Sequence, residues 1–487
     1  MEFTYPFGLD RRELLKSMIA APLLAQAPAP AAIATAEAQR QGTSRTAGMK
    51  FKALVRHGNS LTTETLTMRP VHPQQVVIRN QAAQTCYTTT GALNTTNAVA
   101  NANVAGHGGV GIVEDVGSQV RRVQVGDQVV MSITPHCGAC ANCLNGRADI
   151  CAMFGRPAIP SATMADGTPV QMANGPSGYA EYLVTWEEFV IPVFTKVPVV
   201  ELSLLACVSA CGLGLAMCRF PIEAGSDVAV FGLGPVGLSA VQGARIQGAH
   251  RIIGIDPIKY RRDLALTLGA TDVIDANAER GNDLVTKINS LTGDVVPAGR
   301  FFAGQLRAPG PMYVLEAAGG TRFPLPAGVE APFDMTGVDA LQQAYNVVRG
   351  GGYVRTCSVG HPPNATVSFP AARWANSSKT HVPGNFAGVQ ALRDIPRFVK
   401  LIEKGLFDAK SLIGKMYPSD QTREALQAAA DRSVSGSAPP GGFHEQLLTA
   451  SAAHCNFSPE HDDARERGNV QDDQRQTGEQ RVGAALG

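Results

Sequence analysis

Four cysteines in one short, polar stretch are spaced as metal ligands. They follow the pattern C-x2-C-x2-C-x7-C and are Cys137, Cys140, Cys143 and Cys151. Cysteines three residues apart in a loop can direct their thiolates to one point, as tetrahedral zinc coordination requires. A disulfide between such close cysteines is strained, so oxidation to two disulfides is the less favoured alternative. We predict a closed structural zinc site, which leaves no open position for catalysis.

Zinc chemistry would therefore need a second set of ligands. Cys86 in "QTCYTTT", His107 in "VAGHGGVG" and Cys207 in "LSLLACVSA" are the candidates. Each of these residue types, taken alone, is more often packed or solvated than bound to a metal. Together, two thiolates and one imidazole would form a three-ligand zinc site whose fourth position is open to a reacting molecule.

The middle of the chain has the pattern of a dinucleotide-binding turn. A short apolar strand over 228–231 precedes Gly232, Gly234 and Gly237, and a helical pattern follows. A second predicted strand, RIIGID, ends at Asp256. The glycines allow the backbone to turn and approach a pyrophosphate at the helix N-terminus. Asp256 would accept hydrogen bonds from the adenosine ribose and repel a 2'-phosphate, which favours NAD over NADP.

In their order and spacing, these motifs resemble those of the zinc-dependent medium-chain alcohol dehydrogenases. The resemblance runs from about Met49 to about Gly436 and is carried by Cys86, GHGGVGIVE, the four-cysteine loop, Cys207, GLGPVG and LGATDVID. It implies an α/β fold, in which a GroES-like, β-rich catalytic domain carries both zinc sites and a Rossmann domain with a doubly wound parallel sheet is inserted. We place the catalytic domain at 49–208 and 386–436, and the NAD-binding domain at 209–385.

The resemblance also implies the chemistry of the site. Zinc held by Cys86, His107 and Cys207 would bind an alcohol oxygen and lower the pKa of the hydroxyl, and hydride would pass reversibly to NAD. Thr88 matches the hydroxyl that begins the proton relay of the family. Ile133 matches a position that lines the substrate pocket, which indicates that the pocket is apolar.

Several positions near the expected catalytic zinc differ from the family pattern. Gly108 replaces the glutamate that usually follows the ligand histidine, and Thr89 replaces an acidic residue. Carboxylates in such positions orient the ligand imidazole, so we expect zinc to be held less tightly, with the effect on activity undecided. Val236 and Tyr87 are assigned to the cofactor site, where Tyr87 replaces a basic residue and predicts weaker phosphate binding. The segment 276–311 is longer than usual, and we expect it to add a surface loop.

Composition describes a globular protein large enough for two domains. The chain has 487 residues, of which 44% are hydrophobic and 17% charged, and its formal net charge is +1. This balance predicts neither nucleic-acid binding nor attraction to an anionic membrane surface, and no stretch beyond the N-terminal segment is apolar enough to span a bilayer. By resemblance, we expect a homo-oligomer, dimer or tetramer, that acts on a small alcohol or aldehyde.

Both ends of the sequence differ from the globular part. Arg11 and Arg12, followed by an apolar, Ala-rich stretch, resemble a twin-arginine export signal, which we place at 1–38. We therefore expect a periplasmic protein; the alternative is a cytoplasmic protein, if translation starts at Met49 or the signal is not used. Residues 437–487 are polar and rich in Pro and Gly at their start, so we expect a disordered tail in place of the family's last apolar strand.

These observations favour an NAD-dependent zinc alcohol dehydrogenase with two zinc ions per chain. One alternative is a glutathione-dependent formaldehyde dehydrogenase, although no glutathione site is evident. Another is a degraded, non-catalytic relative that keeps only the structural zinc, as Gly108, Thr89 and the absent last strand would allow. The three intact ligands, Thr88 and the complete dinucleotide pattern favour the enzyme.

Overall fold

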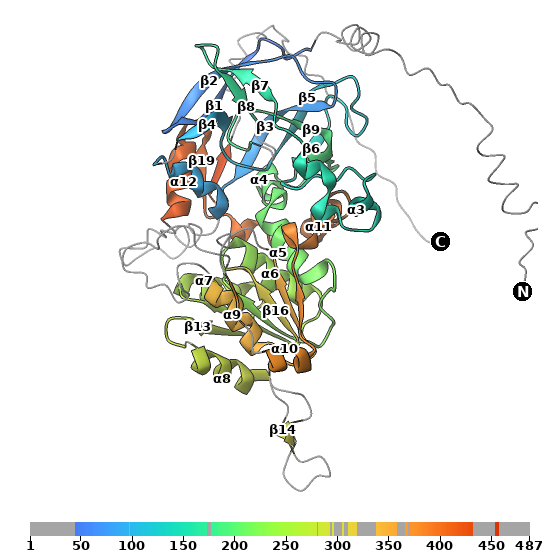
Figure 1. Ribbon diagram of the computed structural model, residues 1–487, viewed down its shortest axis with the longest axis vertical. Coiled ribbons are helices and arrows are strands. Elements are labelled where there is room, and N and C mark those ends of the chain that lie inside the picture. Colours follow the sequence, from blue (N-terminus) through green and yellow to red (C-terminus); the bar gives the residue numbers. More distant parts are fainter. Residues whose placement is uncertain are drawn as a thin grey trace, which may run out of the picture.

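The computed structural model describes residues 44–431, apart from 97, 173–176, 280, 293–294, 297–303, 306–309, 319–337, 358–365 and 369–370, together with residues 453–456. Figure 1 shows two bodies, an upper one built mainly of strands and a lower one with a sheet between helices. The predicted export signal at 1–38 and most of the predicted tail at 437–487 lie outside the described residues.

The β-rich domain contains a closed barrel and a second, larger sheet. The barrel has the strand order β1–β2–β7–β8–β4, and the larger sheet has the order β10–β6–β5–β3–β20–β19, with β9 also paired to β3. The strands are β1 Lys50–Gly58, β2 Ser60–Met68, β3 Gln75–Gln84, β4 Val99–Val104, β5 Gly109–Val116, β6 Gln128–Met131, β7 Pro160–Thr163, β8 Pro169–Gln171, β9 Tyr182–Trp186, β10 Val190–Pro192, β19 Lys415–Pro418 and β20 Ala453–Asn456. The helices of this domain are the 3-10 helix η1 Tyr87–Leu93 and α3 Ala141–Leu144, α4 Val199–Ser203, α11 Ala391–Glu403 and α12 Thr422–Ala430.

The domain begins before the predicted boundary at Met49. Oδ2 of Asp115, a buried residue of β5, accepts hydrogen bonds from Ser44 Oγ at 2.9 Å, Thr46 N at 3.1 Å and Thr46 Oγ1 at 3.0 Å. A buried carboxylate needs such donors, because it is costly to leave unsatisfied. Residues 44–48 are therefore part of the folded domain.

The larger sheet does receive a strand from the C-terminal segment. Strand β20 lies between β3 and β19, antiparallel to the former and parallel to the latter. The prediction of a disordered tail is thus wrong for Ala453–Asn456, and for the rest of 437–487 it stays a prediction. Backbone hydrogen bonds decide strand pairing, and they are available to this polar segment as well as to the apolar last strand that is usual in the family.

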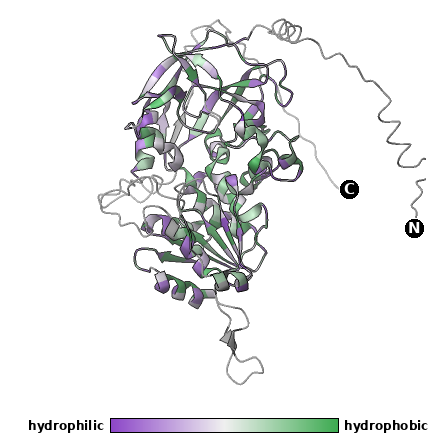
Figure 2. Cartoon of the chain, viewed as in Figure 1, coloured by the Kyte–Doolittle hydropathy of each residue, from purple (hydrophilic) through white to green (hydrophobic). Residues whose placement is uncertain are grey.

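The lower domain has a six-stranded parallel sheet in the order β13–β12–β11–β16–β17–β18. Successive residues of β11 point to opposite faces: Val228 and Val230 pack with α5 and α6, whereas Ala229 and Phe231 pack with α8 and α9. Figure 2 shows these strands as hydrophobic, with hydrophilic residues on the outer helices. The elements are α5 Val208–Met217, β11 Asp227–Phe231, α6 Pro235–Ile246, β12 Arg251–Asp256, α7 Lys259–Leu268, β13 Asp272–Asp275, β16 Tyr313–Glu316, α9 Val338–Val347, β17 Tyr353–Thr356, α10 Ala371–Ser377 and β18 Thr380–Val382.

The segment expected as an added surface loop contains regular structure. Its first part forms α8, Gly281–Thr292, which buries Leu284 and Ile288 against the sheet. The strands β14, Val295–Val296, and β15, Gly304–Gln305, pair as a hairpin that projects from the lower domain in Figure 1. The apolar residues Leu284 and Ile288 are four positions apart, which follows the helical period, so the sequence did contain a signal for this helix.

Helix α5 joins the two domains and is buried along nearly its whole length. It packs closely on α6, because a Cβ at Gly212 would lie 2.2 Å from the Val236 carbonyl oxygen. Among the described residues, no single helix is long and apolar enough to cross a membrane; the segments Val199–Ala206 and Val208–Met217 meet that criterion only as a pair bent by 62°.

Candidate metal and cofactor sites

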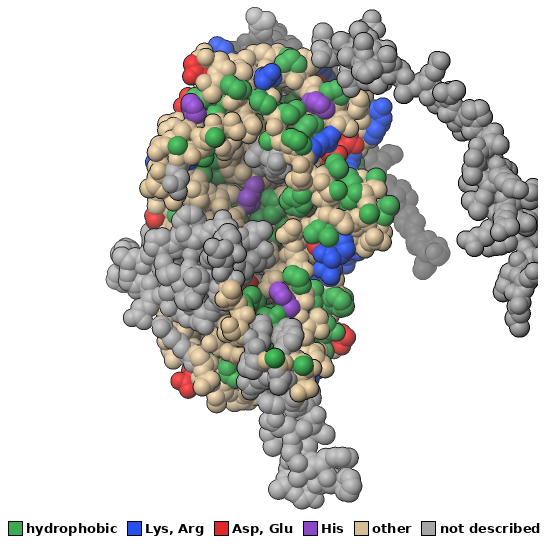
Figure 3. Space-filling model, in the orientation of Figure 1, with side chains coloured by type: hydrophobic (Ala, Val, Ile, Leu, Met, Phe, Trp, Pro, Cys, Tyr) green, Lys and Arg blue, Asp and Glu red, His purple; other side chains and the backbone are tan. Residues whose placement is uncertain are grey.

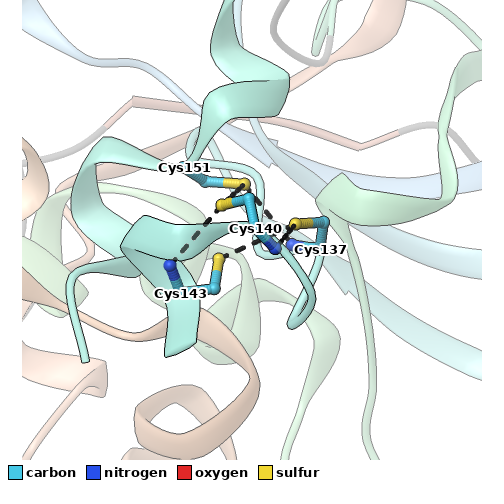
Figure 4. Close-up of side chains that lie close together, drawn as sticks. All are labelled: Cys137, Cys140, Cys143 and Cys151. Atoms are coloured by element: carbon cyan, nitrogen blue, oxygen red, sulfur yellow. Dashed lines mark hydrogen bonds between the residues drawn. The ribbon is translucent and has the colours of Figure 1, made fainter. Parts of the chain in front are cut away.

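The four cysteines of the loop converge as the sequence predicted. Figure 4 shows their side chains pointing toward one another, and their sulfur atoms all lie within 4.8 Å of one another. The Cys137–Cys143 sulfur distance is 3.8 Å and the Cys140–Cys151 distance is 4.0 Å. Zn–S bonds of about 2.3 Å in a tetrahedron place the sulfurs roughly 3.8 Å apart. All four are free thiols, so the disulfide alternative does not apply here.

Backbone amides of the same loop prepare these thiols for a metal. Cys140 N donates to Cys137 Sγ at 3.3 Å, and Cys143 N donates to Cys140 Sγ at 3.5 Å. Hydrogen bonds from the backbone of Ala152 and Cys143 lower the pKa of Cys140 to about 6, whereas burial raises the pKa of Cys143 to about 12. Donors directed at sulfur favour the thiolate, which is the form that binds zinc.

The three candidate catalytic ligands come from distant segments. Cys86 is the residue before η1, His107 lies between β4 and β5, and Cys207 is the residue before α5. Their ligand atoms lie within 4.8 Å of one another, with both cysteines buried. The two sulfur atoms are 4.0 Å apart, and Cys207 Sγ lies 4.0 Å from His107 Nε2. This spacing and donor set fit a zinc ion with an open position.

Thr88 places its hydroxyl at the same point. Thr88 Oγ1 donates to Cys86 Sγ at 3.2 Å and lies 3.0 Å from His107 Nε2, and the residue is exposed to solvent. The hydrogen bond from Cys207, together with His107 and Thr88, holds the pKa of the Cys86 thiol well below its ordinary value. Hydrogen bonds with Cys211 and Cys86, together with burial, raise the pKa of the Cys207 thiol well above its ordinary value. The site therefore combines one readily ionised thiol, Cys86, with a hydroxyl that reaches solvent.

The departures from the family pattern have a structural counterpart at His107. Its Nδ1 is buried and has no hydrogen-bond partner in the described part of the chain. Thr89 Oγ1 instead donates to the Cys86 carbonyl oxygen at 2.6 Å and pairs with the Tyr179 hydroxyl at 2.9 Å. Gly108 has φ +69°, and a Cβ there would lie 2.8 Å from the Ala206 Cβ, so this backbone favours glycine.

Ile133 and Tyr87, two further residues predicted from the sequence, lie next to the segments that carry the ligand cysteines. The backbone N–H of Ile133 donates to the Ala206 carbonyl at 3.2 Å, so Ile133 lies beside the Cys207 segment, half-buried. Tyr87 is the first residue of η1 and is also half-buried. Figure 3 shows that this face of the upper domain is hollowed and that hydrophobic side chains and a histidine lie inside the hollow.

The glycine-rich turn has the geometry of a phosphate-binding turn. Gly232 has φ +85°, and a Cβ at Gly237 would lie 1.7 Å from the Gly232 carbonyl oxygen, so only glycine fits there. Gly234 precedes α6, whose first turn contains Val236, half-buried. The amides at the start of α6 are thereby left available to an anion.

Asp256 ends β12 and turns back toward this loop. Its Oδ2 accepts from Leu233 N at 2.7 Å and its Oδ1 accepts from Ile258 N at 2.8 Å, and each oxygen keeps a further lone pair for a ribose hydroxyl. Arg261, which the sequence analysis did not single out, lies with Nη1 3.7 Å from Asp256 Oδ2. Burial acts to lower the pKa of Arg261, but Asp256 and Tyr260 together outweigh it, so the pKa is raised overall. The sequence gives only a weak signal for Arg261, namely that it is a basic residue in α7, the helix that follows the strand ending at Asp256.

The sequence of this chain matches two family models and several known proteins. Residues 72–195 match the alcohol dehydrogenase GroES-like domain, and residues 235–404 match the zinc-binding dehydrogenase domain. The geraniol dehydrogenase of Castellaniella defragrans is 34% identical over 336 residues, covering 67% of this chain and 80% of its own. The NDMA-dependent alcohol dehydrogenase of Amycolatopsis methanolica is 27% identical over 395 residues, covering 79% and 96%.

A solved structure shows the same architecture. The crystal structure of an alcohol dehydrogenase zinc-binding domain protein from Burkholderia ambifaria superposes with a TM-score of 0.66 at 26% identity, covering 84% of this chain and 99% of that one. The fold is thus a GroES-like domain joined to a Rossmann domain. The chain belongs to the zinc-dependent medium-chain alcohol dehydrogenases, a family of oxidoreductases.

Proposed function

We propose that this protein is an NAD-dependent, zinc-dependent alcohol dehydrogenase that interconverts an alcohol and its aldehyde or ketone. The observation that carries the proposal is the convergence of Cys86, His107 and Cys207, whose ligand atoms lie within 4.8 Å of one another. Ligands separated so widely in the chain meet without forming a disulfide, and the set leaves one tetrahedral position open.

The residues of the site have separate tasks in this reaction. The thiols of Cys86 and Cys207 and His107 Nε2 would hold a zinc ion, which would supply a Lewis acid that lowers the pKa of an alcohol hydroxyl. Thr88 Oγ1, which faces the ligand atoms and solvent, accepts the proton that the alcohol loses and passes it outward. Ile133, beside the Cys207 segment, contributes an apolar surface for the rest of the alcohol.

NAD is the proposed hydride acceptor. The turn at Gly232 to Gly237 provides the pyrophosphate site, and Asp256 provides lone pairs for the ribose hydroxyls. The carboxylate charge disfavours a 2'-phosphate, and Arg261 offsets part of that charge. Val236, which lies between this turn and α5, is proposed to contact the cofactor near the metal.

The first test is the zinc content of the full-length protein, measured by elemental analysis during treatment with 1,10-phenanthroline. We expect two zinc ions per chain, one of which leaves readily together with NAD-dependent oxidation of primary alcohols. One tightly held zinc without activity would instead identify a non-catalytic relative. Activity only when glutathione and formaldehyde are supplied together would identify the glutathione-dependent alternative.

We also propose periplasmic localisation through twin-arginine export, and assembly as a homo-oligomer. The contacts of Ser44 and Thr46 with Asp115 support a chain that is translated from upstream of Met49. Fractionation of cells that express the full chain tests the first proposal, because Arg11→Lys with Arg12→Lys should retain the protein in the cytoplasm. Light scattering of the purified protein tests the second.

A further inference from the structure

One buried aromatic residue contacts two of the three segments that carry the ligands of the three-ligand site, those of His107 and Cys86. Tyr179 precedes β9 and is 1% exposed. Its backbone N–H donates to the Ala105 carbonyl at 3.1 Å, and a Cβ added at Gly106 would lie 2.6 Å from its ring. The ring therefore fills the space over the residue that precedes His107, and Gly106 has φ +87°, which suits glycine.

The other end of Tyr179 reaches the loop that carries Cys86. Its hydroxyl lies 2.9 Å from Thr89 Oγ1 and 3.4 Å from the Gln84 carbonyl. Thr89 has one hydroxyl proton and donates it to the Cys86 carbonyl at 2.6 Å. Thr89 is then the acceptor in its 2.9 Å contact with the Tyr179 hydroxyl, whose single proton also faces the Gln84 carbonyl at 3.4 Å. Hydrogen bonds thus connect Tyr179 with the backbone of both Cys86 and Gln84.

His107 lacks the usual means of fixing a ligand imidazole. Metal-bound histidines commonly donate their second N–H to a carboxylate, carbonyl or water. Here Nδ1 is buried without a partner in the described part of the chain, although Nε2 faces the cysteine thiols. The orientation of the ring must therefore come from the backbone around it, and that backbone packs against Tyr179.

We propose that Tyr179 is the positioning residue of the three-ligand site, fixing His107 through its ring and Cys86 through its hydroxyl and Thr89. This inference rests on the proposed function, because it takes zinc to be the ligand of that site. In this role Tyr179 contacts neither zinc nor substrate. Its contribution is to hold two loops so that their ligand atoms meet without rearrangement.

The test compares zinc release from the full-length wild type, Tyr179→Phe and Thr89→Val. Removal of outer hydrogen bonds typically weakens metal binding about 10–100-fold, so we expect both variants to release the three-ligand zinc about tenfold faster or more. The four-cysteine zinc in the same molecule is the internal reference and should leave at an unchanged rate. Thr89→Ser keeps the hydroxyl and should restore slow release, and Tyr182→Phe, a phenol three residues along, should behave as wild type.

Cobalt substitution gives a second readout that is independent of activity. Cobalt in the three-ligand site should show displaced d–d absorption bands in Tyr179→Phe and Thr89→Val but not in Thr89→Ser. Equal release rates and unchanged cobalt spectra would overturn this inference while leaving the proposed function intact. A wild-type protein that holds only the four-cysteine zinc would overturn both this inference and the proposed function. Loss of the four-cysteine zinc from Tyr179→Phe would mean that this variant unfolds generally. Thr89→Val then decides the test, and zinc release from it at the wild-type rate would overturn the inference.

Discussion

The two metal sites of this protein are built in opposite ways. The four-cysteine site draws all its ligands from one loop, and amides of that loop donate to its sulfur atoms. The three-ligand site brings together Cys86 and Cys207, which are separated by 121 positions, and buries both. Closing a short loop costs little entropy, so local ligands can converge almost alone, whereas distant ligands depend on packed elements that carry them.

Each site is vulnerable to changes in a different part of the molecule. The four-cysteine loop contains its own supporting donors and an ion pair between Arg147 and Asp149 at 2.9 Å. The three-ligand site depends on Tyr179 and Thr89, which bind no metal, and on β5, which begins two residues after His107. We therefore expect changes in one site to leave the other occupied, and the predictions below test that independence.

The largest effect is expected for Cys143→Ser in the four-cysteine loop. A serine hydroxyl is a poor zinc ligand, and loss of a structural zinc site should lower the free energy of unfolding by about 5 kcal/mol. Denaturant unfolding with a parallel zinc assay measures this. Ala139→Ser, an exposed position of the same loop, is the matched control. Wild-type stability with both zinc ions retained would contradict the structural role.

Cys86→Ala should remove activity without removing the four-cysteine zinc. Lewis-acid stabilisation of several kcal/mol is lost, so we expect kcat/KM to fall by about 10³-fold and zinc content to fall from two ions to one. The control is Cys218→Ala. It removes a buried thiol that contacts Asp394 and belongs to neither metal site. Loss of both zinc ions would show that the two sites are not independent.

A chain that starts at Met49 should be less stable than one that starts at Ser44. The truncation removes three hydrogen bonds from the buried Asp115 carboxylate, which should cost about 2–3 kcal/mol. Because Asp115 belongs to β5, the three-ligand zinc should also leave faster, while the four-cysteine zinc stays. Equal denaturation midpoints for the two chains would show that residues 44–48 contribute nothing.

The smallest effect is expected for Asp256→Asn, which touches neither metal site. The amide keeps the shape of the side chain but removes the charge that opposes a 2'-phosphate, and it leaves Arg261 to attract one. We expect the ratio of kcat/KM for NAD to that for NADP to fall about tenfold, or 1.4 kcal/mol, with zinc content unchanged. The control is Asp275→Asn, since Asp275 ends the next strand, β13, and pairs with Arg262 of α7. An unchanged ratio would remove the charge argument for NAD.

Much of the candidate site could be predicted because its residue types are chemically distinctive. Cysteine spacing indicated the loop, and a glycine pattern between strand and helix indicated the turn at Gly232. Tyr179 and Arg261 could not be found in this way, since a tyrosine before a strand and an arginine on a helix are common. Their importance follows from the 2.9 Å contact with Thr89 and the 3.7 Å contact with Asp256, which exist only in the folded chain.

The polypeptide ends were predicted least well, for a related physical reason. Residues 44–48 and Ala453–Asn456 carry little apolar pattern. The first segment was placed outside the fold because the family resemblance begins near Met49, and the second because of its polar composition. They join it through hydrogen bonds, to Asp115 in the first case and to the backbones of β3 and β19 in the second. Such bonds depend on which groups lie opposite each other, and sequence periodicity does not report this.

The sequence by itself determined the ligand types, the closed four-cysteine loop and the nucleotide turn, because each depends on neighbours within a short span of chain. Tertiary structure alone decided that Cys86, His107 and Cys207 meet. It also decided that His107 Nδ1 has no partner in the described part of the chain, and that Tyr179 contacts the segments that carry Cys86 and His107. Local spacing sets what chemistry a segment can offer. The packing of distant segments sets whether those groups reach a common point.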